Sequence, residues 1–561
     1  MKRLLGMALT VAAAVSMAAC AGIPNSGAVN EGATTANGAS ADIEYLPPGP
    51  ARDVDPAAIL QGFIEAASSP QNDFAVAREF LTTTASDSWD PSAMTLIDSG
   101  VRPASDVAVD AITIAVDAAA ILDAEGSYTA QPSPVHVDLP YTFERQGGQW
   151  RIKSLPPGIV IDQNTFAQVF RQTTLYFVTP DAQRFVPDVR WFPARAAATT
   201  RIVKALLAGP STWLSSTGAA SSAFPAGTTL VADSVPVREG TAVVDLDARG
   251  LSASSQALRT MQAQLRASLT QVRSVTSVEI QVLGNTQIDR GSSTAVVEMM
   301  PTVDARPLVI AAGKIGYMSP EGFTALTTGN TAGLNLAGVT GGTLSSSSDR
   351  IALLDASGVW YSRDGMADVQ LVDSRLGLLA PGLDDYGFVW SVPKSEPTQV
   401  RVTSSSGTQT PISVPWGQAI SITALRMSVD GQRAVAAYTD GAGSHVVVAS
   451  VVRDGGGTPT ALGVPVALVA SPREIVDAVW LDPVTVAVAE VDAKGVASAT
   501  RQIVGGQASK YADISSVLAL SGGNAVTQLN ALQRGQILVQ PRGAAYWSVV
   551  GTKVTALLTV Q

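Results

Sequence analysis

The stretch Met427-Ser-Val-Asp-Gly-Gln-Arg433, followed directly by the apolar run Ala434-Val-Ala-Ala-Tyr438, is typical of a tight turn between two strands. The same arrangement recurs where Asp355-Ala-Ser-Gly358 precedes Val359-Trp-Tyr361. Similar apolar runs between Gly, Asp and Ser turns begin at Ile351, Gly387, Arg433, Val484 and Gln536. Their starts lie 36, 46, 51 and 52 residues apart, close to the repeat length of propeller blades. We therefore predict an all-β propeller of about five to six blades over residues 291–561.

Two features of this C-terminal region allow more than one interpretation. A pair of β-sandwiches would give the same number of strands, although the spacing favours the propeller. Packing between blades explains most of its tryptophans, and an aromatic binding face at the rim is the alternative for some of them. These tryptophans are Trp360, Trp390, Trp416, Trp480 and Trp547.

The region before the propeller, residues 164–290, alternates between strand and helix patterns. The predicted strands cover Leu175–Thr179, Thr229–Val235, Ala242–Asp247 and Val275–Leu283. One predicted helix covers Thr199–Leu207 and ends at Gly209-Pro210, and Ser254 caps a second, longer helix. We expect an α+β domain here.

Residues 55–163 place helices first and strands afterwards. Asp55-Pro56 is an N-cap followed by proline at the first helical position, and apolar residues recur from there at helical spacing. A second helix is predicted around Phe74–Leu81. The predicted strands cover Val107–Val116, Val135–Arg145 and Trp150–Leu155. This order predicts a second α+β domain, with a cone-shaped sheet wrapped on the helices.

The N-terminus has the layout of a secretory signal peptide. Lys2 and Arg3 precede the apolar run Leu4–Val15, and Met17-Ala-Ala19 is a small-residue approach to Cys20. We predict a lipoprotein signal over residues 1–19 and lipidation of Cys20 as the first mature residue. The alternatives are an ordinary secreted protein with an incidental cysteine and an uncleaved anchor.

The segment that follows Cys20 is predicted to be a flexible tether. Residues 20–54 are rich in Gly, Ala, Ser, Asn and Pro and have too few large apolar side chains to offset the entropy of ordering them. Residues 43–50 could instead form an extended segment that packs on the first domain.

Charge and cysteine content exclude several classes of protein. Without residues 1–19 the formal net charge changes from −10 to −12, because Lys2 and Arg3 are lost. Such an acidic chain is a poor candidate for binding nucleic acid or anionic lipid. Attachment to a membrane would therefore depend on acyl chains at Cys20. With Cys20 as the single cysteine, the domains can hold neither a disulfide nor a thiolate metal site.

The sequence contains few candidates for catalytic or metal-binding groups. The two histidines, His136 and His445, fall in different predicted domains and within strand patterns, where a structural or exposed histidine is the default. The pairs Asp384-Asp385 and Asp245/Asp247 could bind a hard cation, but turn formation and strand termination suit them better. No zinc-protease, nucleophile-elbow or phosphate-loop motif is present. We predict neither an enzyme nor a cofactor.

Five short motifs, in order along the chain, carry a resemblance to a known family. They are Cys20-Ala-Gly-Ile-Pro-Asn-Ser-Gly27, Gln149-Trp-Arg-Ile152 with Pro156-Pro-Gly158, Leu206-Leu-Ala-Gly-Pro210, Phe224-Pro-Ala-Gly-Thr228 and Val243-Val-Asp-Leu-Asp247. Together they resemble the actinobacterial LpqB lipoproteins, and the middle domain is similar to a GerM-type domain. The resemblance covers essentially the whole chain.

The resemblance implies a non-catalytic lipoprotein on the extracytoplasmic face of the cell membrane. It implies N-acyl and S-diacylglycerol groups, including palmitate, on Cys20. The expected partner is the extracytoplasmic part of a two-component sensor kinase of the MtrB type, with a role in cell-envelope homeostasis and cell division.

Two other hypotheses stay open at this stage. The GerM-like and propeller domains could bind peptidoglycan or another wall polymer, by analogy at the level of fold. A hydrolase or lyase built on the propeller would need a cluster of Asp, Glu, Arg or His at its central channel.

Overall fold

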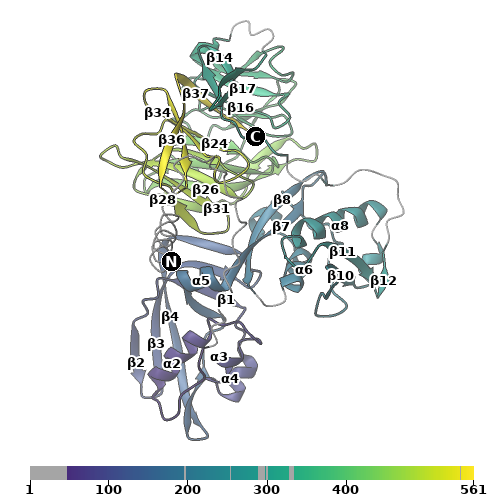
Figure 1. Ribbon diagram of the computed structural model, residues 1–561, viewed down its shortest axis with the longest axis vertical. Coiled ribbons are helices and arrows are strands. Elements are labelled where there is room, and N and C mark those ends of the chain that lie inside the picture. Colours follow the sequence, from purple (N-terminus) through teal and green to yellow (C-terminus); the bar gives the residue numbers. More distant parts are fainter. Residues whose placement is uncertain are drawn as a thin grey trace, which may run out of the picture. The chain divides into compact units, whose positions relative to one another are not determined.

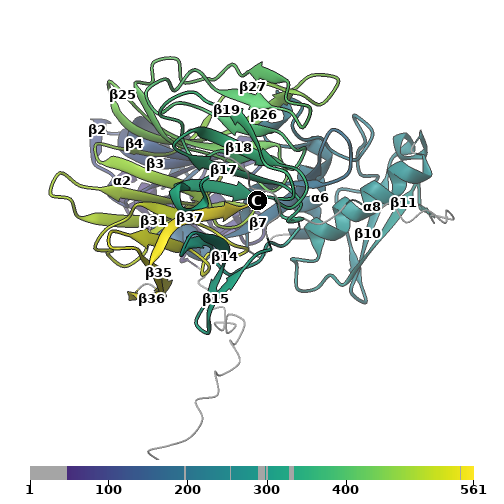
Figure 2. The ribbon, with the colours of Figure 1, turned by 90° about the horizontal axis from the view of Figure 1, so that it is seen from above.

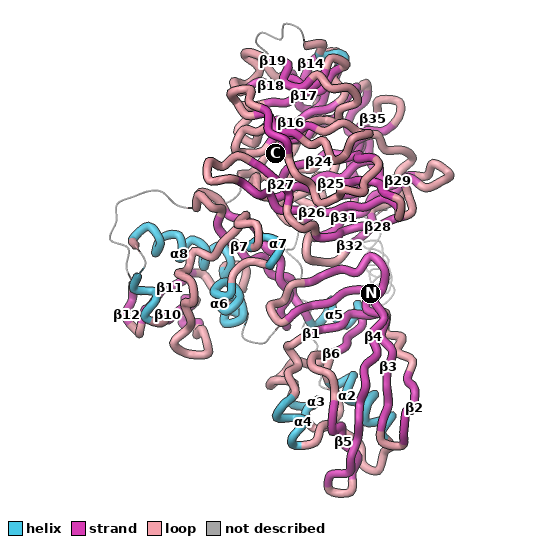
Figure 3. Tube along the Cα trace, turned by 180° about the vertical axis from the view of Figure 1, so that it is seen from behind, coloured by secondary structure: helices cyan, strands magenta, loops and turns pink. Residues whose placement is uncertain are grey.

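The structure, a computed structural model, describes residues 47–194, 198–252, 254–287, 297, 301–327, 334–543 and 545–561. All of them belong to one compact unit, Pro47–Gln561. Figure 3 shows the helices gathered in the two N-terminal α+β domains, whereas the C-terminal region consists almost wholly of strands and loops. This confirms the predicted fold class. The predicted signal peptide and Cys20 lie outside the described residues.

The first domain begins where the sequence predicts a capped helix. Helix α2 (Pro56–Ala66) has Asp55 as its N-cap, whose side chain accepts a hydrogen bond of 2.9 Å from the backbone N–H of Ala58. The helix buries Ile59, Leu60 and Phe63 against the sheet. Such a cap contributes about 1 kcal/mol to helix stability.

The predicted second helix is interrupted. Helix α3 (Ala75–Arg78) ends early, and helix α4 (Thr83–Ser88) starts only after a break. In that break, Ile152 accepts a backbone hydrogen bond from Thr82 and donates one to Phe80. The helix predicted around Phe74–Leu81 is therefore present but shorter than expected, because the end of this segment pairs with a strand that is distant in sequence.

The sheet of the first domain wraps around α2 (Figure 1). Its strands are β1 (Met94–Asp98), β2 (Ala104–Ala108), β3 (Ala111–Asp123), β4 (Tyr128–Gln146), β5 (Gln149–Ser154) and β6 (Ile159–Asp162). They lie in the order β5-β4-β3-β1-β6, with β2 paired to β3. The single strand predicted over Val107–Val116 is therefore two strands, because a turn at Val109-Asp110 folds β2 back on β3.

Residues ahead of α2 pack on the first domain. Pro47 is buried, and the backbone N–H of Asp53 donates to the Gln149 side chain at 2.7 Å. The Gln149 amide in turn donates to the Asp53 carboxylate at 2.9 Å. Part of the segment assigned to the tether therefore belongs to this domain, as in the packed alternative left open for residues 43–50.

The second domain combines a hairpin, helices and a small sheet. Its elements are α5 (Gln163–Val169), β7 (Phe170–Val178), β8 (Phe185–Pro193), α6 (Ala198–Ala208), α7 (Thr212–Ser215), β9 (Val237–Arg238), β10 (Thr241–Leu246), η1 (Ala248–Ser252), α8 (Ser255–Leu269), β11 (Ser277–Val282) and β12 (Asn285–Thr286). Ser254 caps α8 as predicted, with its hydroxyl accepting from Ala257 at 3.2 Å. Strands β10 and β11 run parallel on either side of α8 in the chain. The hairpin, α6, α8 and the sheet share one core.

The strand predicted over Thr229–Val235 is absent from this sheet. Leu230 forms one isolated bridge with Leu246, and no further ladder follows it in this segment. The backbone groups of Val235 bond instead to threonine hydroxyls of α6: its N–H donates to Thr200 at 2.9 Å, and its carbonyl accepts from Thr199 at 3.1 Å. Threonine hydroxyls of α6 thus form the hydrogen bonds of a backbone position that the alternating pattern assigned to a strand.

The described strands of the C-terminal region form a six-bladed propeller. Four blades are separate sheets, and the eight-stranded sheet contains the other two. In the first blade, β13 (Leu308–Ala311), β14 (Lys314–Ser319) and β15 (Gly322–Ala325) join β37 (Val554–Val560). The second contains β16 (Gly341–Leu344), β17 (Ile351–Asp355), β18 (Gly358–Ser362) and β19 (Gln370–Asp373), and the third β20 (Gly382–Leu383), β21 (Val389–Ser391), β22 (Arg401–Thr403) and β23 (Gln409–Pro411).

The remaining three blades follow in chain order. The fourth contains β24 (Ser421–Met427), β25 (Arg433–Asp440), β26 (Gly443–Arg453) and β27 (Pro459–Leu462), with β28 (Val466–Ser471) also paired to β26. The fifth contains β29 (Glu474–Trp480), β30 (Thr485–Val491), β31 (Ala497–Ile503) and β32 (Ala508–Lys510). The sixth contains β33 (Ala519–Ser521), β34 (Asn530–Gln533), β35 (Ile537–Arg542) and β36 (Tyr546–Thr552). The predicted blade number is confirmed at its upper value.

The last strand of the chain closes the ring. Strand β37 pairs antiparallel with β13, with Leu308 opposite Leu558, and parallel with β16, with Thr343 opposite Thr559. Figure 2 shows β37 and the C-terminus between the strands of these two blades. The first and second blades are therefore joined through a strand from the far end of the chain.

Candidate functional site

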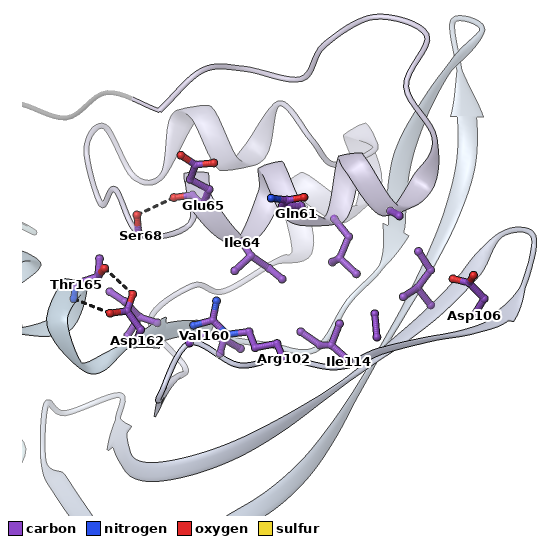
Figure 4. A pocket seen from close by; sticks show the side chains of 16 residues that line it. Gln61, Ile64, Glu65, Ser68, Arg102, Asp106, Ile114, Val160, Asp162 and Thr165 are labelled. Carbon is purple, nitrogen blue, oxygen red and sulfur yellow. Dashed lines mark hydrogen bonds between the residues drawn. The ribbon is translucent and has the colours of Figure 1, made fainter.

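A pocket of the first domain lies between α2 and the concave face of its sheet (Figure 4). Its volume of about 580 Å³ falls within the range of small-molecule binding sites. The helix lines it with residues that recur every three or four positions: Ala57, Leu60, Gln61, Ile64, Glu65 and Ser68. The opposite wall comes from β2 and the segment leading into it, from β3, from β6 and from the start of α5.

An ion pair forms the middle of the pocket floor. The Arg102 guanidinium donates from Nε to Asp98 Oδ2 at 2.7 Å and from Nη2 to Asp98 Oδ1 at 2.9 Å. Asp98 is 1% exposed and also accepts from the backbone N–H of Gly100 at 2.8 Å. This bidentate geometry balances the charge of Arg102 and fixes its side chain beneath Ile64 (Figure 4).

One end of the pocket is polar. Figure 4 shows Glu65 on α2 and Ser68 just beyond its end, across from Thr165 and Asp162, with the Glu65 carboxylate directed away from the sheet. Asp162 caps α5, and its carboxylate accepts from the hydroxyl of Thr165 at 2.6 Å and from two backbone N–H groups. Partial desolvation raises the pKa of Asp162, but these hydrogen bonds outweigh it and hold the pKa below its ordinary value. Asp162 is therefore ionised at neutral pH.

The other end of the pocket is mainly apolar. Strand β2 pairs with β3 so that Ala104 lies opposite Ile114 and Asp106 opposite Ile112. The two isoleucines are buried, as is Leu60 on the helix, whereas Asp106 is exposed at the rim. The pocket therefore changes from carboxylates and hydroxyls at one end to aliphatic side chains at the other.

The two histidines lie in strands, as predicted. His136 is exposed in β4, with Nδ1 2.8 Å from the Asp117 carboxylate. His445 lies in β26, with Nε2 2.9 Å from Asp440 and its ring stacked on Tyr438. The structure places them in different domains and brings neither to the pocket.

The Asp384-Asp385 pair forms ion pairs that the sequence did not reveal. Asp384 is buried, with Oδ2 2.8 Å from Nη2 of Arg453 and 3.2 Å from the indole nitrogen of Trp390. Asp385 lies 2.5 Å from Nη2 of Arg184. Both aspartates also lie in the predicted turn, which the hydrogen bond from Gly387 to the carbonyl of Asp384 closes.

The Asp245/Asp247 pair caps backbone groups. Asp245 accepts from the backbone N–H of Gly284 at 2.9 Å, and Asp247 accepts from that of Arg249 at 3.1 Å. Strand β10 ends between them, which confirms the predicted strand termination. The described residues contain no group of three or more His, Cys, Asp or Glu arranged to hold a metal ion.

The propeller tryptophans are mostly core residues, as predicted. Trp360, Trp390, Trp416 and Trp480 are buried, and Trp547 is half-buried. A small pocket of about 100 Å³ lies where the innermost strands β24, β29, β33 and β37 end. Asp482 is the one charged residue among its described lining residues, and its carboxylate accepts the backbone N–H groups of Val484 and Thr485. The charged cluster that the hydrolase hypothesis requires is thus not found at this described pocket.

Sequence reasoning missed the pocket of the first domain. The spacing of Leu60, Ile64 and Ser68 on one helical face was visible, but an apolar stripe predicts core packing in the first place. The pairing of Arg102 with Asp98 could not be predicted from their spacing of four positions, because the two residues lie at a strand end and in a loop and not on a helix. What the sequence does not show is that α2 stands away from the sheet at this point.

Comparison with known proteins places each domain in a described family. Residues 49–167 match "Lipoprotein LpqB, N-terminal domain", residues 174–288 match "Sporulation and spore germination", and residues 327–557 match "Lipoprotein LpqB beta-propeller domain". Among solved structures, the first GerMN domain of the sporulation protein GerM from Bacillus subtilis is 18% identical and covers 22% of this chain and 93% of its own, with a TM-score of 0.19.

Curated relatives extend the match along most of the chain. Lipoprotein LpqB of Bifidobacterium longum is 30% identical over 473 residues, which cover 81% of this chain and 79% of that protein. Lipoprotein LpqB of Cutibacterium acnes is 34% identical over 206 residues, 36% of this chain and 34% of its own. In the part of the chain that the structure describes, no helix is long and apolar enough to cross a membrane. The chain belongs to the LpqB family of lipoproteins.

Proposed function

We propose that this lipoprotein is a non-catalytic accessory of a two-component sensor kinase of the MtrB type, anchored by lipidated Cys20 on the extracytoplasmic face of the cell membrane. In this role it contributes to cell-envelope homeostasis and cell division. Acylation at Cys20 supplies the membrane attachment, since two or more acyl chains are what stable anchoring requires. Anchoring both proteins in one membrane raises their effective concentration for each other.

The proposal that the protein acts by contact rests on how the described domains use their buried charged side chains. Asp384 pairs with Arg453 at 2.8 Å and links the third and fourth blades. Asp430 pairs with Arg433, where both side chains are at most 1% exposed, and holds the turn between β24 and β25. These side chains form hydrogen bonds with other groups of the fold and therefore stabilise the fold. Membership of the LpqB family supports the same conclusion, because the family resemblance implies an accessory role.

Crosslinking in intact cells tests this proposal. The chain is expressed at its native level with a photoreactive residue on an exposed propeller loop, and the crosslinked partners are identified by mass spectrometry. We expect the extracytoplasmic part of a sensor kinase among them. A matched sample with Cys20→Ser, released from the membrane, should lose most of this product. Recovery of wall polymer alone, with co-sedimentation of the purified protein with cell wall, would instead support the wall-binding hypothesis.

A further inference from the structure

Strand β2 is an open edge of the sheet in the first domain. It pairs with β3 and with no other strand among the described residues. Figures 1 and 3, which view the molecule from opposite sides, both show it as the outermost strand on its side of the sheet. Every residue from Pro103 to Asp110 is exposed, so no described segment covers this edge. Such an edge can accept a strand from another chain.

The register of β2 on β3 shows which backbone groups face outward. The N–H of Ala115 donates to the carbonyl of Pro103 at 2.9 Å, and this bond fixes the alternation of bonded and non-bonded pairs along the ladder. The N–H and carbonyl of Ala104 and the N–H of Asp106 consequently point away from β3. An added strand would form its hydrogen bonds with these groups.

Three exposed valines lie along the same edge. Val101, Val107 and Val109 are 70%, 69% and 87% exposed. Natural proteins usually protect open edges with Lys, Pro or very short strands. The outer propeller strands β23 and β32 follow this rule, because each has three residues and they end on Pro411 and Lys510. Strand β2 has five residues and contains neither Lys nor Pro, so it lacks this protection.

The charges around the edge select a basic partner. Residues 103–144 contain seven carboxylates and neither Lys nor Arg. Asp106 and Asp110 are exposed and form no ion pair with a described residue. A second copy of β2 would bring these carboxylates against their own counterparts, and like charges across a strand pair are destabilising. We infer that the β2 edge takes up an extended segment of another protein that carries basic and aliphatic side chains, a contact that does not rest on the proposed kinase partner.

Two peptides test the chemistry of the partner. The probe is a fluorescein-labelled octapeptide of alternating Lys and Val with blocked ends, and its anisotropy is followed as the mature chain, residues 20–561 with Cys20→Ser, is added. The comparison peptide carries Glu in place of Lys. We expect saturable binding of the Lys peptide, about tenfold or more tightly than the Glu peptide. Equal binding of both peptides, or no binding of the Lys peptide, would overturn the inference.

Backbone methylation of the probe separates strand addition from simple attraction between charges. A version of the Lys peptide that is methylated at every backbone nitrogen keeps its charges but has no N–H donors for the edge. It should bind about tenfold or more weakly than the parent peptide. Equal binding of the methylated peptide would show that charge alone holds the probe and would refute strand addition.

Two charge reversals place the binding at β2. Asp106→Lys reverses a charge on the open edge, and Asp87→Lys is the matched control, because Asp87 is exposed on α4 of the same domain. Asp106→Lys should weaken binding of the Lys peptide several-fold, whereas the control should leave it unchanged. An equal effect of both variants, or of neither, would contradict the site.

Sedimentation of the peptide-free chain tests whether a second copy is the occupant. We expect a monomer at micromolar concentrations, because the edge carboxylates repel one another. A dimer that Val107→Lys dissociates would show that β2 pairs with itself, and this result would overturn the inference. None of these readouts uses a kinase, so their failure and that of the proposed function are separate outcomes.

Discussion

The side-chain oxygens of Thr343 and Thr559 lie 2.7 Å apart, although 216 residues separate them in the sequence. Thr343 lies in β16 and Thr559 in β37, and both are buried. The Thr343 hydroxyl can also donate to the carbonyl of Pro381 at 2.7 Å. This contact marks where the end of the chain closes the propeller ring.

The closing strand should be essential for the stability of the propeller. Leu558 is 1% exposed in β37 and lies opposite Leu308. Leu558→Ala should destabilise the propeller by about 2–5 kcal/mol, because it leaves a cavity in a packed core. Leu376→Ala is the matched control, since Leu376 is 87% exposed. Urea unfolding, followed by tryptophan fluorescence, compares the stability of the two variants. Equal unfolding midpoints for both would contradict a stabilising role of the closing strand.

The buried pair of Asp384 and Arg453 should be far more costly to break than an exposed one. Asp384→Asn leaves the Arg453 guanidinium buried without its counter-charge, and we expect a loss of about 3–5 kcal/mol. Asp304→Asn breaks the partly exposed pair with Arg306 and should cost less than about 1 kcal/mol. Chemical denaturation measures both losses. Similar losses of unfolding free energy for the two variants would show that burial does not make the pair of Asp384 and Arg453 more important for stability.

His136 should titrate above its ordinary range, because the hydrogen bond with Asp117 raises its pKa. Partial desolvation opposes this shift, and the charge of Asp138 adds to it. A raised pKa means that the folded chain holds the proton more tightly, so this stabilisation is fully present below the ordinary histidine pKa. It is lost as the pH rises through the raised value.

Two variants check the cause of this shift. Asp117→Asn should lower the His136 pKa more than Asp138→Asn, whose carboxylate lies 3.5 Å from the ring. The chain has only two histidines, so NMR of the imidazole protons resolves the titration, and His445→Gln assigns the signals. A larger effect of Asp138→Asn on the His136 pKa would show that the hydrogen bond with Asp117 is not the main cause of the shift.

Replacement of Cys20 should release the protein from the membrane without unfolding it. Cys20 precedes the first described residue, Pro47, and we expect Cys20→Ser to leave all three domains folded. The variant should lose palmitate labelling and move to the soluble fraction, whereas Ser26→Ala should behave as the parent. Retention of Cys20→Ser in the membrane pellet after a carbonate wash would reveal another anchor.

The sequence predicted the propeller through one strand in each of five blades. The five apolar runs coincide with β17, β21, β25 and β30, which are second strands of their blades, and with β35, which is the third strand of the sixth blade. The four second strands are mostly buried on both faces, so they are almost continuously apolar. Outer strands such as β32, which is fully exposed, carry no such pattern. The first blade escaped notice because its innermost strand comes from the other end of the chain.

Other features depend on contacts between distant segments and could not be predicted. The break between α3 and α4 exists because Thr82 pairs with Ile152. The segment 229–235 meets β10 only around Leu230, because α6 supplies the hydrogen bonds of Val235. The pocket likewise requires a space between α2 and the sheet. Local signals, by contrast, were reliable: Asp55 and Ser254 cap helices at the predicted positions.

The most direct test of the central claim is binding between two purified components. The mature chain, immobilised through a lipid anchor at position 20, is titrated with the extracytoplasmic domain of the MtrB-type kinase from the same organism, and binding is followed by surface plasmon resonance. An accessory that acts by contact predicts saturable binding with a Kd at or below the micromolar range. The absence of binding at micromolar concentrations of the kinase domain would contradict it.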